Sequence, residues 1–171
     1  MTLKLVNDHL KEELLIVFVG FNPSLMSSQT GHHFANPNNR FWKILHESGL
    51  TPYKLQPTED ETLLNYQYGL TNIVARPTKA ADEITKEEYE LGKVILKEKI
   101  TKLRPKIVCY VGKGVYLQFS GKKKAPWGKQ DESVVPGTID FVAPSSSGLV
   151  RMKLEETINI YKELNKLKEV E

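Results

Sequence analysis

The sequence is poor in cysteine and in long apolar runs, and both shortages exclude classes of protein. Only Cys109 is a cysteine among 171 residues, which excludes an internal disulfide, an iron–sulfur cluster and a cysteine-rich zinc site. No apolar run approaches the ~18 residues of a membrane helix, and acidic residues interrupt the N-terminal stretch where a signal peptide would be apolar. We therefore expect a cytoplasmic protein without a membrane partner, folded as one domain over residues 1–171.

The excess of positive over negative charge is also small, and the charges are unevenly distributed along the chain. The net charge is +3, from 24 Lys+Arg against 21 Asp+Glu. Residues 1–85 hold 7 basic and 9 acidic residues, a balance of −2, whereas residues 86–171 hold 17 and 12, a balance of +5. The run Lys122, Lys123 and Lys124 could contact nucleic-acid phosphates or form a solvated loop, and charge alone favours the loop.

Short apolar runs alternate with helical patterns along the chain. Runs rich in β-branched residues predict strands at residues 14–19, 70–74, 107–111 and 139–143. Apolar residues at helical spacing predict a long helix between a capping box at Thr85 and the stop at Pro105. Further helices are predicted over residues 39–48, 113–119 and 153–168. This alternation predicts a three-layer α/β/α fold with a central, mostly parallel sheet of four or five strands.

Ligands bind beyond the carboxyl ends of the strands in such sheets. The segments after Val19, Val74, Val111 and Ala143 are therefore the candidate site segments. The first of them runs to Arg40 with little periodicity, and a loop of that length in a compact domain is usually functional.

This first segment carries two candidate binding residues. Asn22 follows a buried strand and precedes Pro23, so its stiffly held amide could bind substrate or water, although a role in turn geometry fits equally well. Phe34 lies in a polar loop and could stack on a flat ligand. Phe41 and Trp42 begin a helix and are expected in the core.

The sequence lacks the residue patterns of metal sites, nucleotide-binding loops and serine hydrolases. His32 and His33 are adjacent, and neighbouring side chains seldom point to one centre. With no acidic residue or cysteine nearby in sequence, no metal site is predicted. The sequence contains no phosphate-binding loop, dinucleotide fingerprint or G-x-S-x-G elbow.

The segment from Pro144 to Arg151 is rich in serine. Its hydroxyls could donate hydrogen bonds to phosphates. Leu149 could insert into a DNA stack, as apolar wedges do in proteins that distort duplexes, or it could pack under the last helix.

Five segments together resemble a known family: Gly20–Leu25, Gly31–Phe34, Asn39–Lys43, Thr71–Asn72 and Pro144–Leu149. Their order is similar to that of the mismatch-specific uracil-DNA glycosylases, bacterial relatives of thymine-DNA glycosylase, from about Leu14 to about Leu164. The resemblance implies a bacterial-type monofunctional DNA glycosylase that flips uracil out of a G·U mismatch and hydrolyses its N-glycosidic bond. It also implies double-stranded DNA as partner, no cofactor, and downstream enzymes that process the abasic site. A DNA enzyme of this size with one continuous domain is expected to act as a monomer.

The resemblance implies roles for individual residues. Asn22 would position the attacking water, Phe34 would stack on the flipped base, and Leu149 would fill the vacated gap. The base pocket would comprise Gly20, Phe21, Pro23, Ser24, His33, Phe34, Asn72 and Thr78. The DNA-binding residues would be Ser145, Ser146, Ser147, Gly148, Leu149 and Arg151, together with Lys122, Lys123 and Lys124.

The sequence also departs from the family. Phe21 and Ser24 stand where Ile and Gly are usual, which affects the expected shape of the pocket. A histidine at position 33 is similar to the pattern of the thymine-acting branch of the family. This similarity makes G·T a second expected substrate, ranked after G·U. A neutral Asn is a poor base, so slow turnover is expected. Two alternatives remain: a module that binds mismatched DNA without cutting it, and an enzyme of free nucleosides, against which the basic second half and Leu149 argue.

Overall fold

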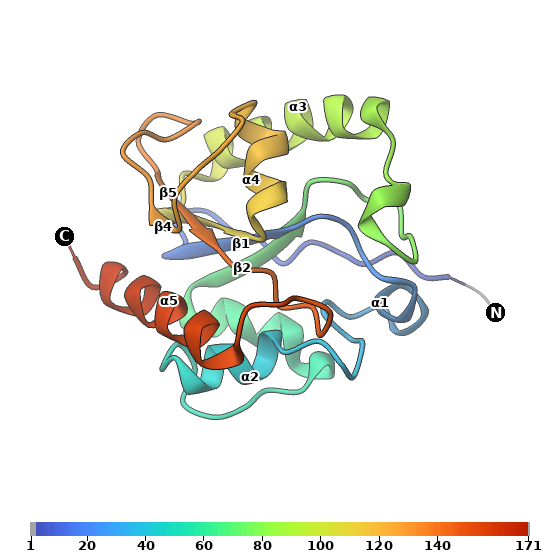
Figure 1. The fold of residues 1–171 in the computed structure, drawn as a ribbon, viewed down its shortest axis with the longest axis horizontal. Helices are drawn as coiled ribbons and strands as arrows, with labels where there is room; N and C mark the ends of the chain where they lie inside the picture. Colours follow the sequence, from blue (N-terminus) through green and yellow to red (C-terminus); the bar gives the residue numbers. More distant parts are fainter. Residues whose placement is uncertain (1–2, 171) are drawn as a thin grey trace.

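The computed structural model describes residues 3–170 (Figure 1). Its strands are β1 (Ile16–Gly20), β2 (Tyr68–Asn72), β3 (Ile107–Val111), β4 (Gly128–Lys129) and β5 (Ile139–Ala143). Its α-helices are α1 (Leu25–Thr30), α2 (Phe41–Glu47), α3 (Lys86–Leu103), α4 (Lys113–Ser120) and α5 (Leu154–Leu167). Two 3₁₀ helices are η1 (Pro57–Tyr66) and η2 (Ala81–Glu83). Among the described residues, no helix combines the length and the apolar composition needed to cross a bilayer.

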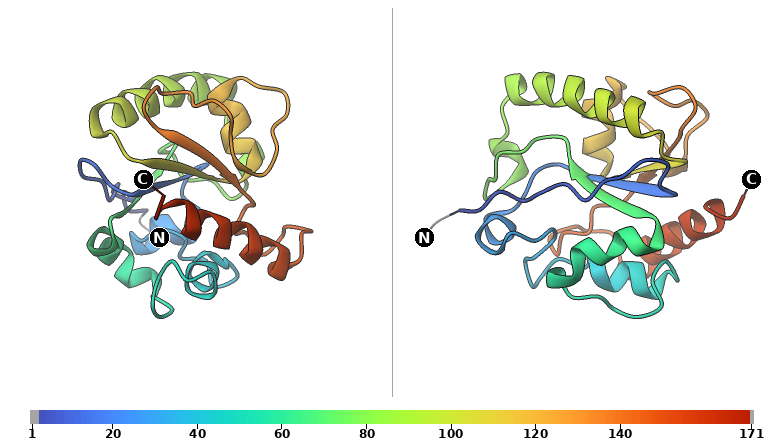
Figure 2. Two further views of the ribbon diagram at one scale, coloured as in Figure 1. Left: turned by 90° about the vertical axis from the view of Figure 1, so that its left-hand side faces the viewer. Right: turned by 180° about the vertical axis from the view of Figure 1, so that it is seen from behind.

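The five strands form one sheet in the order β2-β1-β3-β5-β4. All neighbours run parallel except β4, which pairs antiparallel with β5. Helices α3 and α4 cover one face of the sheet, and α2, α5 and η1 cover the other (Figures 1 and 2). The three-layer fold with a mostly parallel five-stranded sheet is therefore confirmed.

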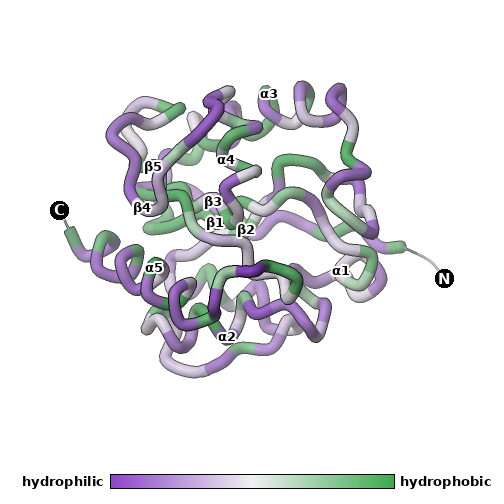
Figure 3. Tube along the Cα trace, viewed as in Figure 1, coloured by the Kyte–Doolittle hydropathy of each residue, from purple (hydrophilic) through white to green (hydrophobic). Residues whose placement is uncertain are grey.

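Each face of the sheet has its own apolar core, because successive side chains of a strand point to opposite faces. Ile16 and Phe18 of β1 pack with α2 and α5, and Val17 and Val19 pack with α3 and α4. This double burial explains why the strands are continuous apolar runs in sequence. The same runs form the hydrophobic centre of the chain trace (Figure 3). Phe41 and Trp42 lie in the first of these cores, as expected.

The predicted elements differ from the structure mainly at their ends. Helix α3 begins after Thr85, whose Oγ1 accepts a hydrogen bond from the backbone N–H of Glu88, and it ends two residues before Pro105. Strand β2 lies two residues earlier than predicted, and the segment after β1 contains the short helix α1. Elements η1, η2 and β4 were not predicted, because 3₁₀ helices lack the 3.6-residue period and β4 has only two residues.

Candidate functional site

A cleft of about 700 Å³ opens at the carboxyl edge of the sheet. Its walls come from β3 and from the segments that follow β1, β2 and β5, so all four strand ends selected from the sequence meet there. The segments after β1 and β2 are joined directly, because the backbone N–H of Thr78 donates to the carbonyl of Pro23 and a bridge links Ser24 to Thr78. The site is thus assembled from residues far apart in sequence.

The amide of Asn22 is fixed in one orientation. Its Nδ2 donates to the backbone carbonyl of Arg76 and to Oγ1 of Thr78, both at 2.8 Å. Thr78 is 4% exposed, and its own hydroxyl proton goes to the carbonyl of Ala80 at 2.7 Å, so its oxygen must accept from Asn22. Both amide protons of Asn22 are therefore used, and Oδ1 is left as a pure acceptor at the cleft wall.

The segment that holds Asn22 is itself clamped to helix α3. The guanidinium of Arg76 makes a paired contact with Glu88, with Nε at 2.7 Å from Oε2 and Nη2 at 2.9 Å from Oε1. Nη2 also donates to the carbonyl of Glu83. The hydrogen bond from Arg76 lowers the pKa of Glu88 to about 2. This clamp fixes the carbonyl of Arg76 that accepts from Asn22.

Phe34 presents an aromatic ring to the cleft. Its ring stacks on Phe41 with centroids 4.0 Å apart and planes 17° from parallel, so one face is covered by the core. The backbone of Phe34 has a φ of +50°, in the left-handed region, and its carbonyl accepts from Nε1 of Trp42 at 3.2 Å. A non-glycine residue held in this region marks a position that its surroundings determine strongly. The ring is therefore rigidly placed for a second flat group.

Asn72 ends strand β2 beside this ring. It is the sheet partner of Gly20, and a Cβ atom on Gly20 would lie 2.7 Å from Oδ1 of Asn72 and 3.8 Å from Cζ of Phe34. Glycine at position 20 thus allows the amide of Asn72 and the ring of Phe34 to face the same part of the cleft. An amide and an aromatic face together match the edge and the plane of a nucleobase.

The two departures from the family pattern have structural explanations. The ring of Phe21 packs against α4 at Gly114, where a Cβ atom would lie 2.7 Å from its Cζ, and it makes an edge contact with Tyr89. Oγ of Ser24 accepts from the backbone N–H of Ser27 at 3.0 Å and caps helix α1. Both side chains are therefore engaged by neighbouring structure, although their residues line the cleft.

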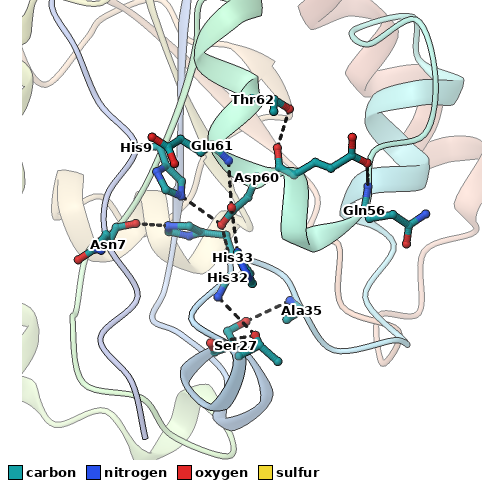
Figure 4. Close-up of polar contacts among 12 residues, drawn as sticks. Asn7, His9, Ser27, His32, His33, Ala35, Gln56, Asp60, Glu61 and Thr62 are labelled. Atoms are coloured by element: carbon teal, nitrogen blue, oxygen red, sulfur yellow. Dashed lines mark hydrogen bonds and ion pairs between the residues drawn. The ribbon is translucent and has the colours of Figure 1, made fainter.

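His33 forms part of the cleft wall but is mostly buried among polar groups. It is 3% exposed, and its Nε2 lies 2.7 Å from the carbonyl of Asn7. Burial lowers the pKa of His33 below its ordinary value. Its backbone N–H donates to Asp60, which also contacts His9 and His32 (Figure 4). Burial raises the pKa of Asp60, but the hydrogen bonds from His33 and His32 outweigh burial and leave it below the usual value.

The serine-rich segment after β5 forms the opposite wall. It is tied to the first loop, because the backbone N–H of Arg40 donates to the carbonyl of Ser146 at 2.8 Å. Oγ of Ser145 and Oγ of Ser147 accept backbone N–H groups, so their hydroxyl protons are free to donate outward, whereas Ser146 is buried. Leu149 is 94% exposed, so the alternative that it packs under the last helix is wrong.

The charges at the cleft are all positive. Arg40 and Lys79 are the charged residues of its wall, and no carboxylate lines it within residues 3–170. Both cations were missed in the sequence, where nothing marks them apart from other basic residues. Arg151 and the lysine run at 122–124 are not among the lining residues, and that run follows the C-terminal end of α4, opposite the end that joins β3.

Comparisons with known proteins agree with this geometry. Residues 8–167 match the uracil DNA glycosylase superfamily, so the chain belongs to that superfamily. A similar structure was solved by solution NMR for a Methanosarcina acetivorans protein that was proposed to be a uracil DNA glycosylase. The match has a TM-score of 0.56 at 19% sequence identity and covers 95% of this chain and 98% of the other. This likeness supports the fold, and the superfamily indicates DNA glycosylase activity on uracil.

Proposed function

We propose that the protein hydrolyses the N-glycosidic bond of uracil mispaired with guanine in duplex DNA. The observation that carries the proposal is the locked amide of Asn22. With both protons of Nδ2 donated to Arg76 and Thr78, Oδ1 can accept a hydrogen bond from one water and aim that water's lone pair at the sugar carbon. This bond is inaccessible in a stacked base, so the nucleotide must first leave the duplex.

The neighbouring groups suit a flipped pyrimidine. Phe34 offers one ring face, since Phe41 occupies the other. Uracil carries an N–H donor next to a carbonyl acceptor, and the amide of Asn72 carries the complementary pair. All eight residues of the proposed base pocket line the cleft: Gly20, Phe21, Pro23, Ser24, His33, Phe34, Asn72 and Thr78. In this proposal Thr78 acts through Asn22, because its hydroxyl is already used.

The chemistry of the cleft favours slow turnover. No carboxylate lines the cleft among the described residues, so no carboxylate there can act as a general base toward the attacking water. Acceleration must then come from orientation of that water and from hydrogen bonds that stabilise the leaving uracil anion. A mispaired base costs less to unstack, which favours G·U first and G·T second.

The rim of the cleft suits duplex DNA. Exposed Leu149, beside Gly148, would fill the gap left by the flipped nucleotide. Arg40 and Lys79, with Ser145 and Ser147, would hold phosphates on either side. Ser146 stays a proposed DNA-binding residue on the cleft wall, where its side chain is buried. Arg151 and the run Lys122, Lys123 and Lys124 stay proposed DNA-binding residues outside the lining of the cleft. We propose action as a monomer, followed by enzymes that process the abasic site.

The test is cleavage of a panel of labelled duplexes, each with one G·U, G·T or G·C pair. After incubation, alkali breaks the strand at any abasic site, and gel electrophoresis measures the broken fraction. We expect strand breaks at G·U, fewer at G·T and none at G·C. Intact strands with retained, salt-sensitive binding would instead identify a module that binds mismatched DNA without cutting it. Failure to retard any duplex at low salt would overturn DNA as the substrate and favour a free nucleoside.

A further inference from the structure

A cluster of potential metal ligands lies at the edge of the cleft, outside the proposed catalytic groups. His9 comes from the N-terminal segment, where it bridges to Leu70, while His33 follows helix α1 and Asp60 lies on η1. One nitrogen or carboxylate oxygen from each of the three residues lies within 4.8 Å of the others. Figure 4 shows the three side chains converging. His33 and Asp60 are buried and His9 is partly buried, so the cluster is shielded from bulk water.

The spacing inside the cluster is close to that of a metal site. A tetrahedral zinc ion with bonds of about 2.0–2.1 Å places adjacent ligand atoms about 3.3 Å apart. Nε2 of His9 and Oδ2 of Asp60 are already 3.1 Å apart. The ligand atom of His33 would need to shift by no more than about 1.5 Å to complete a three-ligand set.

The surrounding hydrogen bonds orient these groups as outer partners orient metal ligands. Nε2 of His33 is 2.7 Å from the carbonyl of Asn7 and donates to it, which leaves Nδ1 as the basic nitrogen. Oδ1 of Asp60 is held by His32 at 3.1 Å and by the backbone N–H of Glu61 at 2.9 Å. The carboxylate therefore keeps its position when Oδ2 exchanges a hydrogen bond from His9 for a cation.

We propose that His9, His33 and Asp60 bind a divalent transition-metal ion, with Zn²⁺ as the best fit. Two imidazole nitrogens and one carboxylate oxygen favour Zn²⁺, Co²⁺ or Ni²⁺ over Mg²⁺ and Ca²⁺, which prefer oxygen ligands only. Bound metal joins the N-terminal segment to the loop that leads into Phe34. His33 also belongs to the proposed base pocket, but metal binding is measured without DNA, so the failure of either proposal can be told apart from the failure of the other.

The experiment is a Co²⁺ titration of the full chain after treatment with a chelator. We expect one equivalent of Co²⁺ to give a saturable d–d absorption band, which Zn²⁺ abolishes and Mg²⁺ leaves unchanged. His9→Gln should weaken Co²⁺ binding at least about 100-fold, since it removes a ligand and not merely an outer partner. Asp60→Asn should do the same, but its carboxylate also accepts backbone hydrogen bonds, so circular dichroism must confirm that this variant folds.

The matched control is His46→Gln, because His46 lies on α2 and is not a proposed ligand, whereas the fourth histidine, His32, contacts Asp60. Its Nδ1 lies 3.5 Å from the carbonyl of Thr51, and the variant should bind Co²⁺ as the wild type does. Zn²⁺ should also raise the Tm of the wild type and of His46→Gln, and leave that of His9→Gln unchanged. Absence of saturable Co²⁺ binding to the wild type, or equal binding by His9→Gln, would overturn the site and leave only a hydrogen-bonded cluster.

Discussion

Thr78 offers a sharp test of how the structure positions Asn22. Its buried hydroxyl accepts one of the two protons of Nδ2, so Thr78→Val removes that acceptor while preserving the shape of the side chain. A buried donor left without a partner costs about 1–3 kcal/mol, and the hydrogen bond to the carbonyl of Arg76 survives. Misorientation of Asn22 that raises the activation free energy of cleavage by about 1.4 kcal/mol, within this range, slows cleavage about tenfold.

The assay is single-turnover cleavage of a G·U duplex, which isolates bond breaking from product release. We expect the rate constant of Thr78→Val to fall about tenfold, with little change in the Kd for the duplex. Thr78→Ser keeps the hydroxyl and should stay within about threefold of the wild type. A rate for Thr78→Val equal to that of the wild type would refute the idea that this hydrogen bond orients the catalytic amide.

Three further outcomes are expected. Leu149→Ala should lower the cleavage rate of duplex DNA without lowering Tm, because Leu149 is 94% exposed; a matching loss of Tm would contradict the wedge role. Arg40→Gln and Lys79→Gln should each reduce the slope of the logarithm of the duplex binding constant against the logarithm of salt concentration by about one. Replacement of residues 122–124 should reduce the same slope if that run also contacts phosphate. The pKa of Glu88 is about 2, below its ordinary 4.5, so its pairing with Arg76 stabilises the fold above pH 4.5 and this stabilisation is lost as pH falls towards 2. In unfolding titrations, the free energy of unfolding of Glu88→Gln should therefore decline less steeply between pH 4.5 and 2 than that of the wild type.

The location of the site could be predicted from the sequence because it follows from local patterns. Runs such as residues 107–111 are buried on both faces, and their alternation with helices requires a parallel sheet. The carboxyl ends of those strands then mark one edge, where the structure places Asn22, Asn72 and Ser145 together. The hydrogen-bond partners of Asn22 could not be predicted, since they lie 54 and 56 residues further along the chain.

Two interpretations depended on three-dimensional information that spacing does not contain. The histidine pair His32–His33 lacks a neighbouring acidic residue in sequence, but folding brings Asp60 and His9 to it from distant segments. The lysine run at 122–124 marks a basic loop, but charge does not say at which edge of the sheet the loop lies. Helix α4 starts at the carboxyl edge after β3 and carries the chain away from it, so the run that follows α4 is not among the residues that line the cleft.

The central claim is that Asn22 orients the water that attacks the sugar. Single-turnover cleavage and duplex binding of Asn22→Ala test it most directly, with Asn159→Ala on the exposed side of α5 as the control. We expect cleavage of G·U duplex by Asn22→Ala to fall at least about 100-fold, with a Kd close to that of the wild type. The control should behave as the wild type in both measurements. Near-normal cleavage by Asn22→Ala would contradict the account.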